Sequence, residues 1–163
     1  MPARHPPRPV AVANRHPRLR VPRGSVERLV AILDAQAARL APRGSSMPAG
    51  ELSVVFLDDP ALATLHADFL GDPSTTDVIT FALGADPAGT VLADIYISPD
   101  VARVQAKEFG VGVREEIARL VVHGMLHACG WEHPDGNERM TSPMWRRQEQ
   151  LLHRFWITPT RTA

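Results

Sequence analysis

Four segments of the chain alternate apolar and polar residues with the two-residue period of a β-strand. They cover residues 9–14, 52–56, 77–83 and 91–98. In the first segment, Val10 and Val12 lie on one face. The last two segments flank a turn rich in Gly, Asp and Pro at 84–89, which predicts that they are neighbours in one sheet.

Other segments carry apolar residues at the three- and four-residue spacing of an amphipathic helix. The first runs from Val26 to Leu40, with Ser25 as its N-cap and Pro42 and Gly44 after its end. The others begin at Asp59-Pro60, at Ser98-Pro99, at Val113 and at Ser142-Pro143, and they end near residues 68, 109, 129 and 155. The longest of them stops at Gly130, because glycine readily takes the left-handed conformation that ends a helix.

Helices and strands occur without the regular alternation of a doubly wound fold. We therefore expect an α+β fold with a small mixed sheet of four strands and about five helices. A length of 163 residues suits a single domain with a core of ordinary size. We expect residues 25–163 to form that domain, and residues 1–24 to form a basic arm rich in Pro and Arg whose strand at 9–14 joins the sheet.

Charge is distributed unevenly, although the formal net charge is zero. Residues 1–48 hold nine Arg against Glu27 and Asp34, which gives +7, and residues 49–163 carry −7. The basic part is either a solvated tail or a surface that touches RNA, and the sequence leaves both interpretations open.

The sequence predicts neither export nor a membrane anchor. No stretch approaches the roughly 18 apolar residues of a membrane span. The first 25 residues hold six prolines, lack the apolar core of a signal peptide and would break the helix of a mitochondrial transit peptide. The lone Cys129 cannot form an internal disulfide. We therefore expect a cytoplasmic protein.

Three histidines form the main chemical motif. His123 and His127 are four residues apart in the longest predicted helix, so their side chains stack one turn apart on one face. Gly130 then turns the chain, and His133 approaches from a third direction. Three imidazoles in this arrangement bind zinc and leave one tetrahedral position open, as in catalytic zinc sites. We predict one zinc ion per chain, held by His123, His127 and His133.

The same spacing occurs in the metzincin peptidases, whose helix has the pattern H-E-x-x-H-x-x-G-x-x-H. This chain has Gly124 where those enzymes have the glutamate that takes a proton from water, so peptidase chemistry of that type lacks its base. Glycine inside a helix costs about 1 kcal/mol relative to alanine. This cost indicates a steric reason, such as close approach of the sheet or of an RNA backbone. Cys129 points about 200° away from His127 around the helix, so we expect a core residue rather than a ligand.

The sequence HGMLHACGWEH, from His123 to His133, resembles the signature H-G-x-L-H-x-x-G-Y-D-H of the YbeY family of bacterial zinc-dependent endoribonucleases. Other segments are similar to those of the family in the same order: TTDVITF at 75–81, ADIYIS at 93–98, Arg114-Glu115-Glu116, and Met144 with Gln148-Glu149. The similarity covers roughly residues 50–155. It implies the metalloprotease-like fold of this family, with the histidine-bearing helix at the centre.

The resemblance implies zinc bound by three histidines, cleavage of single-stranded RNA, and roles in maturing the 3′ end of the 16S rRNA and in ribosome quality control. Single-stranded or ribosomal RNA and the small ribosomal subunit are thus the implied partners, without a membrane or DNA. Trp131 and Glu132 replace the family's Tyr-Asp pair and keep its character. Leu70 departs further, because it occupies the place of an arginine that the family uses for activity and that would meet phosphate.

Without that arginine, another group must neutralise charge on the scissile phosphate, since removing such a donor typically costs about 3 to 4 kcal/mol. Arg119, one turn before His123, and the Arg-rich arm are candidates, although an arginine on a helix is more often solvated or ion-paired. The candidates for a general base are acidic residues near the histidines or on the predicted strands: Glu132, Asp135, Asp77 and Asp94.

Two functions stay open at this point. The first is a zinc-dependent endoribonuclease with His123, Glu132 and Arg119 as catalytic residues. The second is a ribosome-assembly or RNA-binding factor with a mainly structural metal and weak nuclease activity, an alternative that Leu70 supports. Gly124 disfavours a metallopeptidase.

Overall fold

A computed structural model describes residues 10–35, 50–71, 78–85, 91–134 and 136–157. Its strands are β1 (Val10–Asn14), β2 (Gly50–Phe56), β3 (Val78–Ala85) and β4 (Val91–Ile97). They form one four-stranded sheet in the order β1-β2-β4-β3. β1 and β4 run parallel to β2, whereas β3 runs antiparallel to β4. The predicted mixed sheet of an α+β fold is confirmed, as is the pairing of the two strands that flank the turn.

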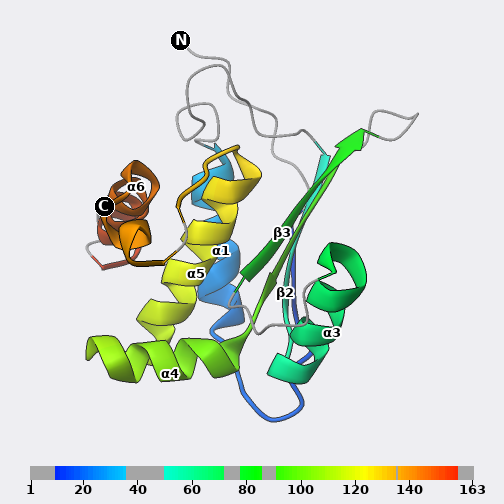
Figure 1. Cartoon of the computed structure of the whole chain (residues 1–163), viewed down its shortest axis with the longest axis horizontal. Helices are drawn as coiled ribbons and strands as arrows, with labels where there is room; N and C mark the ends of the chain where they lie inside the picture. Colours follow the sequence, from blue (N-terminus) through cyan, green and yellow to red (C-terminus); the bar gives the residue numbers. More distant parts are fainter. Residues whose placement is uncertain (1–9, 36–49, 72–77, 86–90, 135, 158–163) are drawn as a thin grey trace.

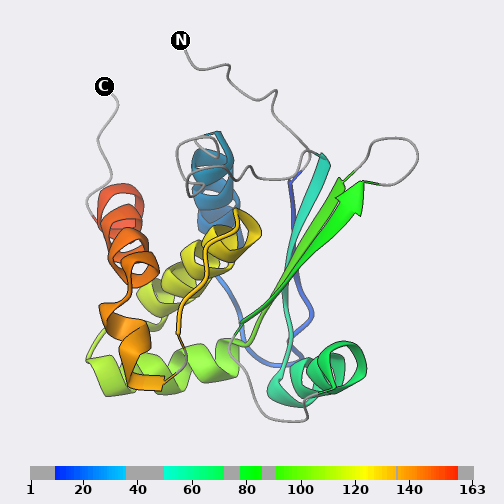
Figure 2. The ribbon, with the colours of Figure 1, turned by 45° about the horizontal axis from the view of Figure 1, so that its top comes forward.

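The α-helices in the described part of the chain are α1 (Arg23–Ala35), α3 (Asp59–Leu70), α4 (Pro99–Phe109), α5 (Val113–Ala128) and α6 (Pro143–Leu152). A 3-10 turn, η1 (Gly136–Thr141), precedes α6, and a π-helical turn, η2 (His153–Ile157), follows it. Helices α1 and α5 cover one face of the sheet, α3 lies on the other, and α6 lies beyond α5 (Figure 1). Figure 2 shows the same layers from a second direction.

Helix α5 is central in the fold, as predicted. It contacts β3 and β4 on one side and α1, α4 and α6 on the others. The core between α1, α5 and the sheet is made of alternate strand residues and of helix residues at three- and four-residue spacing, including Leu52, Val54, Phe56, Ile95, Ile97, Val26, Leu29, Leu33, Ile117 and Val121. Because α5 packs on every side, it holds the side chains that it carries in fixed positions.

Gly124 lies where α5 packs directly against the sheet. A Cβ atom at this position would lie 2.5 Å from Cγ2 of Ile95 on β4 and 3.3 Å from Cγ1 of Val78 on β3. The hydroxyl of Thr80 also donates to the Gly124 carbonyl oxygen at 3.3 Å. Close contact with the sheet, one of the two reasons that the sequence offered, therefore accounts for a glycine inside this helix.

Two helix starts differ from the prediction. Helix α1 begins at Arg23, with the N–H of Val26 donating to the carbonyl of Pro22 at 2.9 Å, so Ser25 lies inside the helix and is not its N-cap. Helix α3 is capped by Asp58, whose side chain accepts from the N–H of Ala61 at 2.9 Å. Pro60 fits the first turn of α3 whether Asp58 or Asp59 is the cap, because the first N–H groups of a helix have no intrahelical partner.

The predicted turn at 84–89 was placed too early. β3 continues through Ala85, with a shift of register between Leu83 and Ala85. Residues 86–90, the end of the first predicted helix after residue 35, and the loop at 72–77 lie outside the described residues. Within the described ranges, no helix has the length and apolar character to cross a membrane.

Candidate metal centre

The three histidine rings converge at the C-terminal end of α5. His123 and His127 lie one turn apart, and Gly130, with a φ of 100°, reverses the chain after the helix. The N–H of Trp131 donates to the carbonyl of Leu126 at 3.0 Å, which directs the next residues back toward the helix. Nε2 of His123 consequently lies 3.0 Å from Nε2 of His127 and 3.3 Å from Nε2 of His133.

The other ring nitrogen of each histidine faces a carbonyl oxygen. Nδ1 of His123 lies 2.6 Å from Oε1 of Gln148. Nδ1 of His127 lies 2.8 Å from the carbonyl oxygen of Trp131, and Nδ1 of His133 lies 3.0 Å from that of Pro134. A carbonyl only accepts hydrogen bonds, so each Nδ1 carries the proton and donates it. Each Nε2 is then left with a lone pair directed at the shared centre.

This donor set fits a zinc ion. Tetrahedral zinc with Zn–N bonds of 2.0–2.1 Å places its nitrogen ligands about 3.3 to 3.4 Å apart, close to the separations of 3.0 and 3.3 Å found here. Lone pairs at such distances repel one another unless a cation lies between them. The cluster of potential ligands in the described residues consists of three histidines, which leaves one tetrahedral position for water or substrate.

His127 is prepared electrostatically to bind a cation. Burial lowers the pKa of its imidazole, and the electrostatic effects of His133 and Arg139 lower it further. The hydrogen bond to Trp131 and the charge of Glu132 act in the opposite direction. The net effect favours the neutral ring, which is the form that binds a metal ion.

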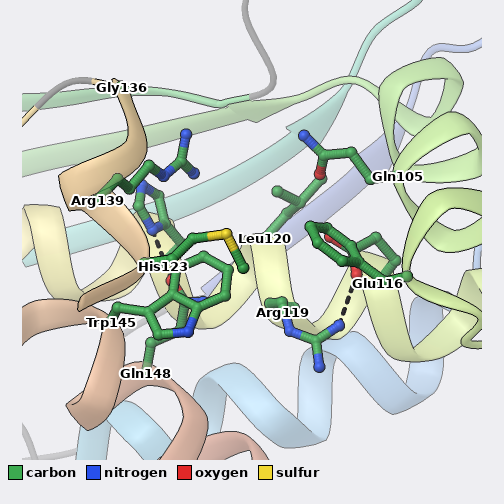
Figure 3. Close-up of a pocket in the computed structure, with 11 residues that line it drawn as sticks. Gln105, Glu116, Arg119, Leu120, His123, Gly136, Arg139, Trp145 and Gln148 are labelled. Carbon is green, nitrogen blue, oxygen red and sulfur yellow. Dashed lines mark hydrogen bonds and ion pairs between the residues drawn. The ribbon is translucent and has the colours of Figure 1, made fainter. Parts of the chain in front are cut away.

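A polar network supports His123 on the Nδ1 side of its ring, away from the shared centre. Gln148 is 1 % exposed, and its amide Nε2 donates to Oε2 of Glu149 at 3.2 Å. Glu149 accepts from Nε of Arg119 at 3.0 Å. The chain of contacts from His123 through Gln148 and Glu149 thus ends at Arg119 on α5. Figure 3 shows His123, Gln148 and Arg119 lining one pocket.

Arg119 is surrounded by carboxylates. Besides Glu149, its guanidinium contacts Glu116 at 2.5 Å and Glu115 at 3.4 Å. Burial lowers the pKa of this guanidinium, but the hydrogen bonds to Glu149 and Glu116 outweigh it and raise the pKa. For Glu116 the balance is reversed: burial raises the pKa of its carboxyl group despite the contact with Arg119. The positive charge of Arg119 is therefore balanced within the protein.

The candidate acidic residues lie in different places. Glu132 is exposed between Gly130 and His133, and its charge acts on His127. Asp94 accepts from the hydroxyl of Ser53 at 2.6 Å. Because Ile95 faces α5 and successive strand residues alternate, Asp94 lies on the opposite face of the sheet from the histidines. Asp77 and Asp135 lie outside the described residues.

Cys129 is 1 % exposed and belongs to the hydrophobic core, as the helix geometry predicted. Two residues at the site were missed from the sequence. Gln148 could have been recognised as a polar residue on the buried face of α6 between Met144 and Leu152, but its contact with His123 could not. Arg139 on η1 lines the pocket beside His123, and its charge acts on His127. No periodic pattern marks Arg139, because η1 is a 3-10 helix of only six residues.

Comparison with known proteins places this chain in a family. Residues 12–156 match the family model described as Endoribonuclease YbeY. Curated proteins named Endoribonuclease YbeY are similar: the one from Frankia alni is 35% identical over 128 residues, covering 71% of this chain and 68% of that protein. The one from Geobacillus thermodenitrificans is 34% identical over 137 residues, covering 78% of this chain and 83% of that protein.

A solved structure supports the fold. The solution structure of a Thermotoga maritima protein superimposes with a TM-score of 0.54 and 21% sequence identity, covering 88% of this chain and 87% of the other.

Proposed function

The chain belongs to the YbeY family, and on that basis we propose that it is an endoribonuclease that hydrolyses phosphodiester bonds in single-stranded RNA at the three-histidine centre. The observation that carries this proposal is the convergence of three Nε2 atoms whose Nδ1 partners are all carbonyl oxygens. Such a centre binds a catalytic metal ion, and the family's name gives the bond that is broken.

We propose zinc as the metal, one ion per chain, held by His123, His127 and His133. When bound, zinc would polarise a phosphoryl oxygen and lower the pKa of a water molecule in the open position. The imidazoles need no proton transfer to bind it, since their Nε2 atoms already carry lone pairs. Gln148 holds the ring of His123 in the required orientation.

For the proton transfer we propose Glu132, which is exposed and acts electrostatically on the neighbouring His127. Arg119 as the group that meets phosphate stays a prediction. Its three carboxylate partners favour a second role, in which Arg119 holds Glu149 and, through Glu149 and Gln148, the ring of His123. Arg139 is the further arginine of the pocket that lies beside His123.

We further propose that the RNA is ribosomal, that the role is maturation of the 16S rRNA 3′ end and ribosome quality control, and that the protein acts on small subunits in the cytoplasm. Residues 25–163 would form one catalytic domain, with residues 1–24 as a basic segment that includes β1 and reaches RNA. The positive charge of residues 1–48 supports contact with phosphate.

A second candidate function is an assembly factor that binds precursor rRNA, keeps a mainly structural metal and has weak nuclease activity. Leu70, the last residue of α3, supports it, because it stands in the place of the arginine implied by the resemblance. Restoring the guanidinium separates the two candidates. Leu70→Arg should raise cleavage markedly if the second candidate is correct, and change it little if another arginine already serves.

Cleavage of a fluorescent single-stranded RNA by zinc-loaded protein tests the first proposal. His123→Ala should abolish cleavage, whereas His153→Ala, which changes an exposed histidine outside the centre, should retain it. Zinc content should be measured by mass spectrometry for the parent and both variants. Equal cleavage by the parent and His123→Ala would refute the proposal, because the centre would then not be the source of activity.

A further inference from the structure

A pocket lies beside His123, and the proposed reaction gives its apolar walls no role. It has a volume of about 150 Å³ and lies between α4, α5, α6 and η1. It is lined by both apolar and polar side chains, among them Phe109, Leu120, Met140 and Trp145. His123 and Gln148 line the pocket as well, whereas His127 and His133 do not, so the pocket borders the metal centre at the ring of His123 (Figure 3).

The size of the pocket selects a single ring. A cavity of about 150 Å³ with apolar walls holds a benzene molecule. One pyrimidine ring therefore fills this pocket, whereas the second ring of a purine would extend beyond its apolar walls toward solvent. A phosphate group alone would leave the apolar walls in contact with water.

The walls of the pocket suit a nucleobase. Trp145 of α6 lies on one side and Glu116 and Arg119 of α5 lie on the other (Figure 3), and Leu120 of α5 also lines the pocket. Aromatic side chains bind unpaired bases by stacking. Glu116 accepts hydrogen bonds and Arg119 donates them, and the polar edge of a pyrimidine carries both kinds of group. A carboxylate has about four acceptor sites, so the contact with Arg119 leaves Glu116 able to accept from a base as well.

We propose that this pocket binds one unpaired pyrimidine base of the RNA strand, close to the phosphodiester that lies over the histidines. The inference rests on the proposed function and adds a sequence preference to it. Only a single-stranded region can turn a base out of its stack at low cost. The pocket would thus explain selection of single strands and would place the strand relative to the metal.

An experiment on binding, free of catalysis, tests the pocket first. Fluorescence anisotropy in the presence of a chelator measures the affinity for a short oligocytidine and for an oligoadenosine of equal length. Trp145→Leu removes the stacking surface and should weaken binding of the oligocytidine about 5- to 100-fold. Trp156→Leu is the matched control, since Trp156 is also half-buried but lies outside the pocket. Thermal melts establish that both variants are folded.

A cleavage experiment then locates the base. Zinc-loaded protein is given a set of RNAs in which one nucleotide at a time, on either side of the cut, lacks its base. The proposal expects one position where removal of the base lowers kcat/KM about 5- to 100-fold, and where cytosine or uracil is cut faster than adenine or guanine. Trp145→Leu should abolish this difference.

The outcomes separate the pocket from the nuclease. Cleavage that depends on His123 but shows no position sensitive to loss of the base refutes base binding in the pocket and leaves the proposal of nuclease activity standing. If the protein cuts no RNA but binds oligocytidine in preference to oligoadenosine through Trp145, the proposal of nuclease activity is refuted and base binding in the pocket is supported. Equal weakening by Trp145→Leu and Trp156→Leu also overturns the pocket.

Discussion

Gly124→Ala tests whether the close contact between α5 and the sheet requires a residue without a side chain. The added Cβ would lie 2.5 Å from Cγ2 of Ile95 and 3.3 Å from Cγ1 of Val78. Carbon atoms attract best at about 3.5 to 4.0 Å, so the helix must move away by roughly 1 Å or Ile95 must leave its rotamer. Overpacking of this kind costs about 1 to 3 kcal/mol.

Alanine also favours the helix over glycine, by about 1 kcal/mol. The net expectation is a loss of up to about 2 kcal/mol in the free energy of unfolding. Urea titration followed by circular dichroism measures it, with a chelator present so that metal binding does not contribute. Gly24→Ala is the matched control, because its Cβ would meet only the end of the Arg28 side chain, at 3.7 Å. That variant should be as stable as the parent or slightly more stable.

The double variant isolates the contact with Ile95. Ile95→Ala removes Cγ2 and should cost about 2 to 5 kcal/mol alone. In that background, Gly124→Ala enters the vacated space and should raise stability by about 1 kcal/mol. The sign of the effect therefore reverses, with a coupling of about 1 to 3 kcal/mol. If Gly124→Ala stabilises the parent protein, or destabilises both backgrounds equally, the steric explanation is wrong.

Three other predictions concern the metal centre and the carboxylates around it. Removing zinc with a chelator should lower the melting temperature by about 5 to 10 °C, because a ligand at a hundred times its Kd adds about 2.7 kcal/mol to stability; an unchanged melting curve would mean that no metal was bound. Gln148→Leu should weaken zinc binding about 10- to 100-fold in a competition titration, because Nδ1 of His123 loses its acceptor, whereas Gln150→Leu, at an exposed position of α6, should not. Burial raises the pKa of Glu116 above 4.5, so its contribution to stability is fully present below pH 4.5 and is lost as the pH rises through the higher folded-state value. The urea midpoint of Glu116→Gln should thus rise relative to that of the parent between pH 4 and 7. A difference between the two midpoints that does not change with pH would contradict the raised pKa.

Much of the centre could be predicted because it is encoded locally. The positions of His123 and His127 follow from the helical repeat, and Gly130 with its positive φ marks the turn that returns His133. The core faces of the strands and helices followed from their periods for the same reason. Helix starts were less certain because Ser25 and Asp59 are acceptable caps, and the choice among neighbouring caps depends on tertiary contacts. Asp59, for example, instead accepts a hydrogen bond from Ser98 on the following strand-to-helix junction.

The supporting residues could not be placed from the sequence because they depend on how distant elements pack. Gln148 meets His123 only because α6 lies against α5, and the spacing of 25 residues between them carries no geometric information. Arg119 was expected near the phosphate from its helical position alone. Its partners lie on its own helix, as Glu115 and Glu116, and on α6, as Glu149, so the balance of its charge appears only in three dimensions.

The orientation of His127 and His133 by main-chain carbonyls has an evolutionary consequence. Every amino acid supplies such a carbonyl, so residues 131 and 134 can drift in sequence without turning either imidazole. His123 differs, since its acceptor in the described structure is the side chain of Gln148. Substitutions at position 148 can therefore change the acidity of the bound metal ion. A carboxylate there would donate electron density through the ring and make the bound metal a weaker acid.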